Sequence, residues 1–219
     1  SIIKAGVIPA LIKNKTNHFS TTWKLSVFRP SDDPIGNLAQ SLADGKNKPE
    51  AVAEELRSGN EGLVNVLSGL DNPSQSRLII VDQFEELFRF QSKEKSLEDK
   101  NREAEQFVKL FTEAIQQRDV PIYVMLTIRA DFLGDCARFE GLPEALNDGQ
   151  YLVPQMNREQ IKSVIMKPVE LAKGKIAPRL VHQLLNDIKD KQDQLPILQH
   201  SMMRAWDKWK QSGQVGHPI

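Results

Sequence analysis

Three carboxylates follow a short apolar run near the middle of the chain. The run is Leu78 to Val81, and Asp82, Glu85 and Glu86 come after it. A run of branched aliphatic residues is typical of a parallel strand whose two faces are covered by helices. The carboxyl end of such a strand is where open α/β sheets bind ligands. An aspartate at that point can hold a hydrated magnesium ion, because this small, hard cation prefers oxygen ligands.

The segment looks like a Walker B strand, whose aspartate holds the magnesium ion in P-loop nucleotidases. A purely structural interpretation explains the same residues. Asp82 precedes Glu85 by three residues and an apolar helical pattern follows, so the two acids also fit a capping box. A capping box would stabilise the start of a helix by about 1 kcal/mol and do no chemistry. This segment alone does not separate the two interpretations.

The composition argues against several classes of protein. The chain has 219 residues, 40% of them hydrophobic, which suits one large domain or one domain and a smaller partner. Lys plus Arg and Asp plus Glu both total 29, so no overall charge favours nucleic acid or an acidic membrane. No apolar run approaches the roughly 20 residues of a membrane span, and the first residues lack a signal-peptide pattern. We therefore expect a soluble, cytoplasmic protein.

Cysteine and histidine do not indicate a site. Cys136 is the single cysteine, so an internal disulfide is excluded, and we expect a small buried or half-buried side chain. The histidines lack metal-ligand spacing; they are His18, His182, His200 and His217.

Strand and helix patterns alternate along the chain, which predicts an α/β fold with a mostly parallel sheet and helices on both faces. Strands are expected at Lys24 to Phe28, Leu78 to Val81, Ile122 to Arg129 and Tyr151 to Val153. Helical patterns cover Ile2 to Ile12, Ile35 to Leu42, Glu50 to Leu56, Leu63 to Leu70, a segment through Phe88, and Glu103 to Gln117. A helical tail follows, with helices at Arg158 to Met166, Arg179 to Ile188 and Pro196 to Trp209. We therefore expect one domain over residues 1–154 and a small helical domain over residues 155–219.

Two polar residues close the strand that begins at Ile122. Thr127 and Arg129 reach the same sheet edge as Asp82 if the two strands lie side by side, and there they could sense a γ-phosphate. The alternative is that Arg129 pairs with Asp131 or with the solvated edge. Pro196 is expected in the first turn of a helix, since its ring presets φ there, and it needs no further role to explain it.

Taken together and in order, several segments resemble the novel STAND-type NTPases. These signal-transduction ATPases are relatives of the NACHT and NB-ARC switch proteins and are often fused to WD repeats. The resemblance covers nearly the whole chain, and the blocks that carry it are Ala5 to Leu11, Phe28 to Pro30 with Asp33 and Pro34, Asp82 to Phe88, Leu126 to Leu133, and Leu195 to His200. It implies a P-loop NTPase fold, with ATP and Mg²⁺ as cofactors.

The resemblance also implies roles for individual residues. Asp82 would hold the metal ion, and Glu85 or Glu86 would orient or deprotonate the attacking water. Arg129 would be the first sensor. Pro196 would match the proline of the GxP motif, which packs near the adenine in related switches, although Gln194 stands where that motif has glycine.

One expected motif is missing from these residues. No G-x-x-x-x-G-K-[ST] pattern occurs, so the backbone nest and the lysine that cradle phosphates are not present. In the family this Walker A loop comes almost directly before the block at Ala5. We therefore expect that the 219 residues belong to a longer chain, in which Ser1 is the magnesium-binding serine of that loop or, as we favour, the residue after it.

The resemblance implies an ATP-dependent signalling switch. Nucleotide held between two domains would fix one arrangement, and exchange or hydrolysis would release another. Such proteins commonly form homo-oligomers when triggered, and effector or WD-repeat domains would share the full-length chain. The alternative is a nucleotide-independent scaffold that keeps the fold.

Overall fold

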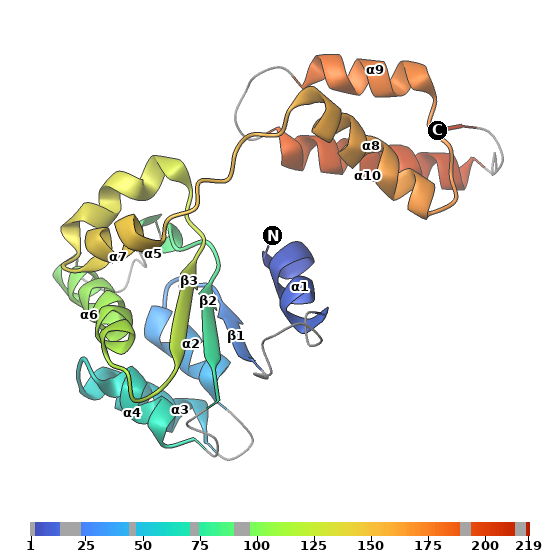
Figure 1. Cartoon of the computed structure of the whole chain (residues 1–219). Helices are drawn as coiled ribbons and strands as arrows, with labels where there is room; N and C mark the ends of the chain where they lie inside the picture. The colour runs from blue at the N-terminus through green and yellow to red at the C-terminus, as the bar shows by residue number, and fades with distance from the viewer. Residues whose placement is uncertain are drawn as a thin grey trace. The chain divides into compact units, whose positions relative to one another are not determined.

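The computed structural model describes residues 3–13, 23–43, 47–70, 75–89, 97–188, 194–212 and 218–219 (Figure 1). Ser1, which the sequence predicts to be the last residue of the phosphate loop or the residue after it, lies outside these residues, as do His18 and His217. The chain divides into two compact units, Ser1–Gln150 and Tyr151–Ile219. The sequence pattern predicts the division after Pro154 instead of after Gln150.

A three-stranded parallel sheet forms the centre of the first unit. Its strands are β1 (Lys24–Phe28), β2 (Arg77–Val81) and β3 (Ile122–Leu126), in the order β1-β2-β3. The sheet is parallel, as predicted, and the strands at Leu78 and Ile122 are neighbours, which is the condition for Asp82 and Thr127 to share one edge. The third strand is shorter than expected, because it ends at Leu126 and not at Arg129.

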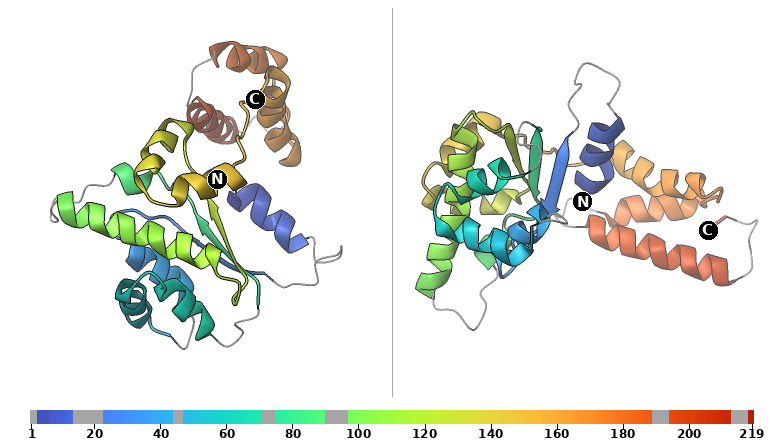
Figure 2. Two further views of the ribbon diagram at one scale, coloured as in Figure 1. Left: turned by 60° about the vertical axis from the view of Figure 1, so that its left-hand side comes forward. Right: turned by 90° about the horizontal axis from the view of Figure 1, so that it is seen from below.

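Helices cover both faces of this sheet, so the predicted α/β fold class is confirmed. Alternate residues of a strand point to opposite faces. Ile79 and Val81 of β2 therefore join the main core, whereas Leu78 and Ile80 pack with Ile3 on the other face. Figure 2 shows the amino-terminal helix on one side of the sheet and the remaining helices of this unit on the other.

Helices lie at each helical segment predicted for the first unit, but the helix predicted from Glu103 begins at Leu97, and the helices at Ala130–Arg138 and Leu142–Gly149 were not predicted. The helices of this unit are η1 (Ile3–Val7), α1 (Ile8–Lys13), α2 (Pro34–Leu42), α3 (Pro49–Ser58), α4 (Gly62–Ser68), α5 (Glu86–Arg89), α6 (Leu97–Gln116), η3 (Ala130–Arg138) and α7 (Leu142–Gly149). Asp33 caps α2 by accepting a hydrogen bond from the amide of Gly36 at 2.9 Å. This cap fixes the residue at which the loop after β1 ends, and that loop lies at the edge of the sheet.

The second unit consists of α8 (Arg158–Leu171), α9 (Pro178–Asp187) and α10 (Leu195–Gln211). The three helices predicted for this tail are therefore confirmed. Their core contains Ile165, Val181, Leu185 and Leu198. Asn157 and Gln160 form a capping box at the start of α8.

The strand predicted at Tyr151 to Val153 is wrong. These residues have no strand structure, and their exposed fractions are 81%, 67% and 57%. Their β-branched and aromatic character favours a strand only where another strand and a core face are available to pack against.

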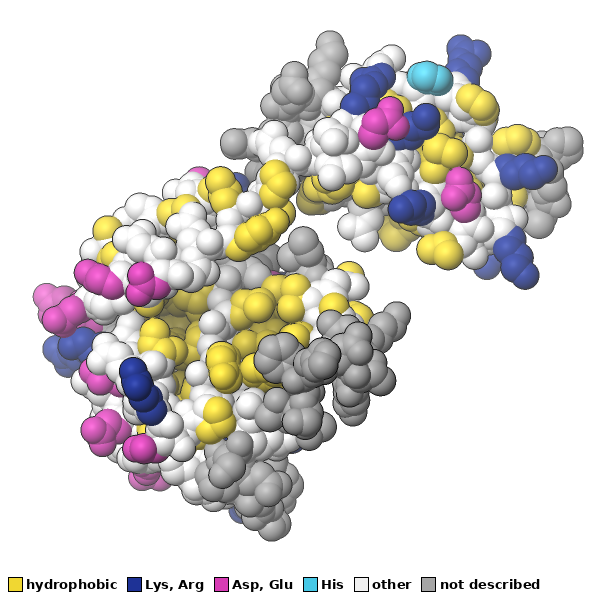
Figure 3. All heavy atoms as spheres, viewed as in Figure 1, with side chains coloured by type: hydrophobic (Ala, Val, Ile, Leu, Met, Phe, Trp, Pro, Cys, Tyr) yellow, Lys and Arg dark blue, Asp and Glu magenta, His cyan; other side chains and the backbone are white. Residues whose placement is uncertain are grey.

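The third strand is much less buried than the second. All residues of β2 are buried, but Tyr123 of β3 is 51% exposed. Figure 3 shows hydrophobic side chains gathered over this part of the first unit. In the part of the chain that the structure describes, no helix has the length and apolar character needed to cross a membrane.

Candidate functional site

The three strands end level with one another. Phe28 pairs with Val81, and Val81 pairs with Leu126. The backbone ladder continues one residue further, since the amide of Asp82 donates to the carbonyl of Phe28 at 2.8 Å and that of Thr127 donates to the carbonyl of Val81 at 2.9 Å. Arg29, Asp82 and Thr127 therefore come together at the carboxyl edge of the sheet, where ligands bind in open α/β folds.

The Asp82 carboxylate is buried, with 4% of the residue exposed, and Thr127 helps to hold it. Thr127 Oγ1 donates a hydrogen bond to Asp82 Oδ1 at 2.9 Å, and it accepts one from the amide of Gln83 at 2.8 Å. Gln83 has a φ of 63°, a left-handed conformation that is uncommon for a residue other than glycine. A hydroxyl has one hydrogen to donate, and Thr127 donates it to Asp82.

This geometry argues against the capping-box interpretation of Asp82. A capping box requires the aspartate side chain to accept from the amide three residues later, at Glu85. Asp82 Oδ1 accepts from Thr127 instead, and α5 begins only at Glu86. Asp82 is thus bound to the neighbouring strand end.

Arg29 places a positive charge next to this carboxylate. Its Nε lies 3.9 Å from Asp82 Oδ2, and its side chain is 51% exposed. Arg29 lies in the block Phe28 to Pro30, but the sequence pattern predicts no role for it. The available signal was its position directly after β1.

Glu85 and Glu86 have different surroundings. Glu85 is 6% exposed, and among the residues that the structure describes its Oε2 has no hydrogen-bond partner. Glu86 accepts two hydrogen bonds from Ser31, one from the amide and one from Oγ, both at 3.2 Å. Buried carboxylate oxygens are normally hydrogen-bonded, so Glu85 Oε2 is an exception that suits a group from outside the described residues.

Arg129 lies beyond β3 and pairs with Asp131. Its Nε and Nη2 donate to the two carboxylate oxygens of Asp131 at 3.1 and 3.0 Å. This charge-assisted hydrogen bonding holds the pKa of Asp131 below its ordinary value. The structure therefore supports the pairing that the sequence offered as the alternative to a phosphate sensor.

The polar residues at this edge fit a magnesium nucleotide. In the described part of the chain, no group of three or more His, Cys, Asp or Glu side chains forms a complete metal site. Magnesium bound to a nucleotide needs few protein ligands, because phosphate oxygens and water supply most of its shell. Asp82 offers a carboxylate, and Glu85 offers a buried oxygen for a water molecule.

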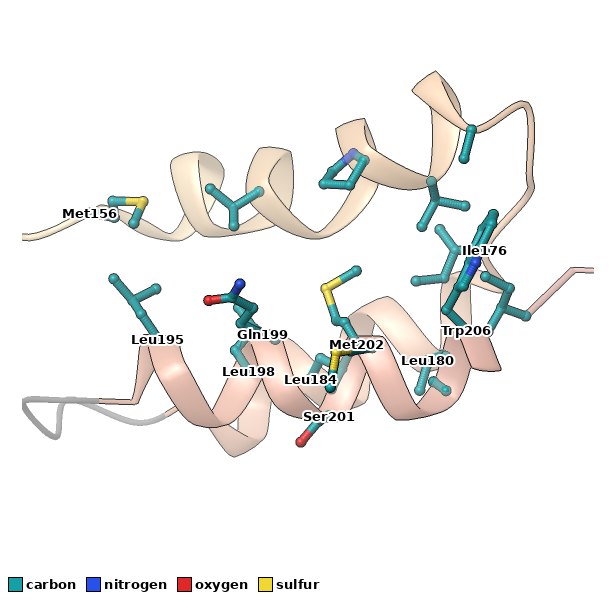
Figure 4. Close-up of a pocket in the computed structure, with 17 residues that line it drawn as sticks. Met156, Ile176, Leu180, Leu184, Leu195, Leu198, Gln199, Ser201, Met202 and Trp206 are labelled. Carbon is teal, nitrogen blue, oxygen red and sulfur yellow. The ribbon is translucent and has the colours of Figure 1, made fainter. Parts of the chain in front are cut away.

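A cavity of about 730 Å³ lies between the helices of the second unit. Figure 4 shows α8 and α10 with apolar side chains between them, including Leu195, Leu198, Met202 and Trp206. Pro196, for which the resemblance implies a place near adenine, is exposed and does not line this cavity. The sequence pattern does not predict this cavity, although large apolar residues recur along α10.

Cys136 is buried, as expected. It is 2% exposed, and burial raises the pKa of its thiol to about 11. His182 and His200 lie on the surface of the second unit. None of these residues belongs to the site at the sheet edge.

A comparison with curated proteins finds no match. The family model described as Novel STAND NTPase 1 matches residues 1–217. This match includes the sheet, the acids at its carboxyl edge and the helical unit, so the chain belongs to the novel STAND NTPase 1 family.

Proposed function

We propose that the chain belongs to an ATP-binding and ATP-hydrolysing switch. The buried pair of acids at the sheet edge carries the proposal. Asp82 is held by Thr127, and Glu85 keeps a buried carboxylate oxygen without a partner among the described residues. A charge buried in this way is costly unless a ligand, a metal ion or bound water compensates it. Residues 1–154 would be the nucleotide-binding domain and residues 155–219 the small helical domain.

Each acid has a separate task in this proposal. Asp82 would bind the metal ion, directly or through water, and Thr127 would keep its carboxylate in one orientation. Glu85 would orient or deprotonate the attacking water, since it is the less engaged of the two glutamates. Bound Mg·ATP supplies the γ-phosphate and the positive charge that stabilises it during transfer. Arg129 would act as a sensor only after leaving Asp131.

The regulatory part of the proposal rests on the family. Nucleotide state would set the arrangement of the two domains, and the active form would be a homo-oligomer. Effector or WD-repeat domains in the same full-length chain would carry the output, in the cytoplasm. Pro196 would contact the base, next to the cavity lined by Leu195 and Leu198.

Calorimetric titration with Mg·ATP tests the proposal. The natural full-length protein should bind it, and Asp82→Asn should weaken the binding in a magnesium-dependent manner. Residues 1–219 alone should bind no more tightly than about millimolar, which corresponds to about 4 kcal/mol, because they lack a phosphate-cradling loop. Micromolar affinity for residues 1–219 would contradict this assignment of the site.

The second candidate is a nucleotide-independent scaffold. One observation favours it, namely that Asp82 and Arg129 both have protein partners of opposite charge. A full-length protein that binds no nucleotide at millimolar concentration would support the scaffold. Binding lost in Asp82→Asn would support the switch.

A further inference from the structure

One short loop contacts two of the acids that follow β2. Arg29 lies 3.9 Å from Asp82, and Ser31 donates two hydrogen bonds to Glu86. The loop begins directly after β1 and ends at the Asp33 cap of α2. The loop therefore links the end of β1 to both of these acids.

We propose that Arg29 is a nucleotide-binding residue whose resting partner is Asp82. In the absence of the metal ion its guanidinium neutralises the carboxylate, and when Mg·ATP binds it turns to the phosphates. This inference rests on the proposed function and adds a residue and a movement to it.

Electrostatics favours the exchange of partners. A guanidinium and a divalent cation of like sign repel each other strongly at the same carboxylate oxygen. Asp82 is buried, whereas the Arg29 side chain is 51% exposed, so Arg29 is the group that can move away. Its displaced charge would remain at the edge where the phosphates lie, and a guanidinium fork matches phosphate oxygens well.

The ion pair is suited to such an exchange. Its distance of 3.9 Å is longer than a charge-assisted hydrogen bond, so little is lost when it opens. An open hollow of about 310 Å³, lined by Arg29, Ser31, Asn37 and Gln40 among others, gives the side chain space to move.

The backbone on both sides of Arg29 is fixed, so that only the side chain has to turn. Phe28 accepts from the amide of Asp82, and the carbonyl of Pro30 accepts from Asn37 Nδ2 at 2.9 Å. Ser31, with a φ of 47°, is held by Glu86. Glu86 is thereby a positioning residue for the loop.

The test uses the natural full-length protein with Arg29→Gln and Arg29→Lys. Arg102→Gln is the matched control, since Arg102 is an exposed arginine on α6 and the charge change is the same. The dissociation constant of Mg·ATP is measured by titration, and the Mg²⁺ concentration for half-maximal binding is measured at fixed ATP. The melting temperature of each variant is recorded in parallel.

Arg29→Gln should raise the dissociation constant about tenfold, which equals about 1.4 kcal/mol. It should also lower the Mg²⁺ requirement, because the metal ion no longer displaces a guanidinium from Asp82. Arg29→Lys should fall between the parent and Arg29→Gln, and Arg102→Gln should match the parent.

Two results would overturn the proposal: an unchanged dissociation constant in Arg29→Gln, or an equal loss in Arg102→Gln. If Arg29→Gln does not fold, the Arg29→Lys variant decides. A parent-like affinity for Mg·ATP in Arg29→Lys overturns the proposal, since lysine lacks the guanidinium group. A parent protein that does not bind Mg·ATP would refute the proposed function as well. A parent that binds, with an Arg29→Gln variant that binds equally, refutes only the role of Arg29.

Discussion

Thr127 Oγ1 lies 2.9 Å from Asp82 Oδ1, although 45 residues separate the two in sequence. The hydroxyl is fixed by a second hydrogen bond, which it accepts from the amide of Gln83. Thr127 therefore joins the end of β3 to the turn after β2. The sequence suggested Thr127 as a phosphate sensor. In the structure its hydroxyl donates instead to Asp82, the proposed metal ligand.

Replacing Thr127 by valine should destabilise residues 1–219 by about 1–3 kcal/mol, because buried Asp82 loses a donor and the amide of Gln83 loses an acceptor. Urea unfolding measures this change. Thr127→Ser keeps the hydroxyl and should recover most of the loss. A valine variant as stable as the parent would show that the hydrogen bond contributes little.

Replacing the two glutamates should separate catalysis from loop anchoring. In the full-length protein, Glu85→Gln should bind Mg·ATP like the parent but hydrolyse it about 100-fold more slowly, because a water-positioning carboxylate acts mainly in the transition state. Glu86→Gln should hydrolyse ATP at close to the parent rate and lose about 1 kcal/mol of stability, because a neutral amide oxygen accepts the two Ser31 hydrogen bonds less strongly than a carboxylate oxygen does. Single-turnover assays and melting curves measure both effects.

A different outcome would change the assignment. If Glu86→Gln abolishes hydrolysis at unchanged stability while Glu85→Gln is active, the roles of the two acids are reversed. If both variants melt and hydrolyse like the parent, neither carboxylate is catalytic and the scaffold gains support.

The carboxyl of Asp131 should titrate below its ordinary pKa of 3.8, because Arg129 hydrogen-bonds to its charged form. A group with a lowered folded pKa stabilises the fold above its unfolded pKa, and this stabilisation is lost as the pH falls through the folded pKa. Arg129→Gln should raise the pKa of Asp131, as measured by NMR titration. An unchanged pKa would mean that the pair seen in the structure does not persist in solution.

Addition of Mg·ATP to the full-length protein extends this measurement. If Arg129 leaves Asp131 to contact a phosphate, the pKa of Asp131 should rise as it does in Arg129→Gln. If the pKa of Asp131 stays low in the nucleotide complex, Arg129 still pairs with Asp131 and is not a phosphate sensor.

Cys136 should react slowly with a thiol reagent at pH 8, because its thiol is buried and its pKa is about 11. Only the thiolate is nucleophilic, so both accessibility and ionisation limit the reaction. The same thiol should react quickly in urea. Since Cys136 is the single cysteine, its labelling rate reports opening of the packing around η3. Fast labelling of the folded protein would contradict the observed burial.

The sequence by itself determined most of the fold. The strand at Lys24 to Phe28 has the predicted bounds, and the strands beginning at Arg77 and Ile122 were found within a few residues. These elements are encoded locally, by apolar runs and by prolines that open helices. The position of Asp82 at the carboxyl edge also followed from sequence, because parallel strands joined by right-handed crossovers end on the same side.

Only the tertiary structure decided which polar side chains meet. Arg29, Asp82 and Thr127 lie far apart in sequence, and the pairing of three strands brings them together. The difference between Glu85 and Glu86 likewise depends on Ser31, 55 residues from Glu86. The failed strand at Tyr151 shows the same limit, since local propensity forms a strand only where a partner strand is available. A residue pattern specifies an element, but the partners of a side chain depend on packing between elements.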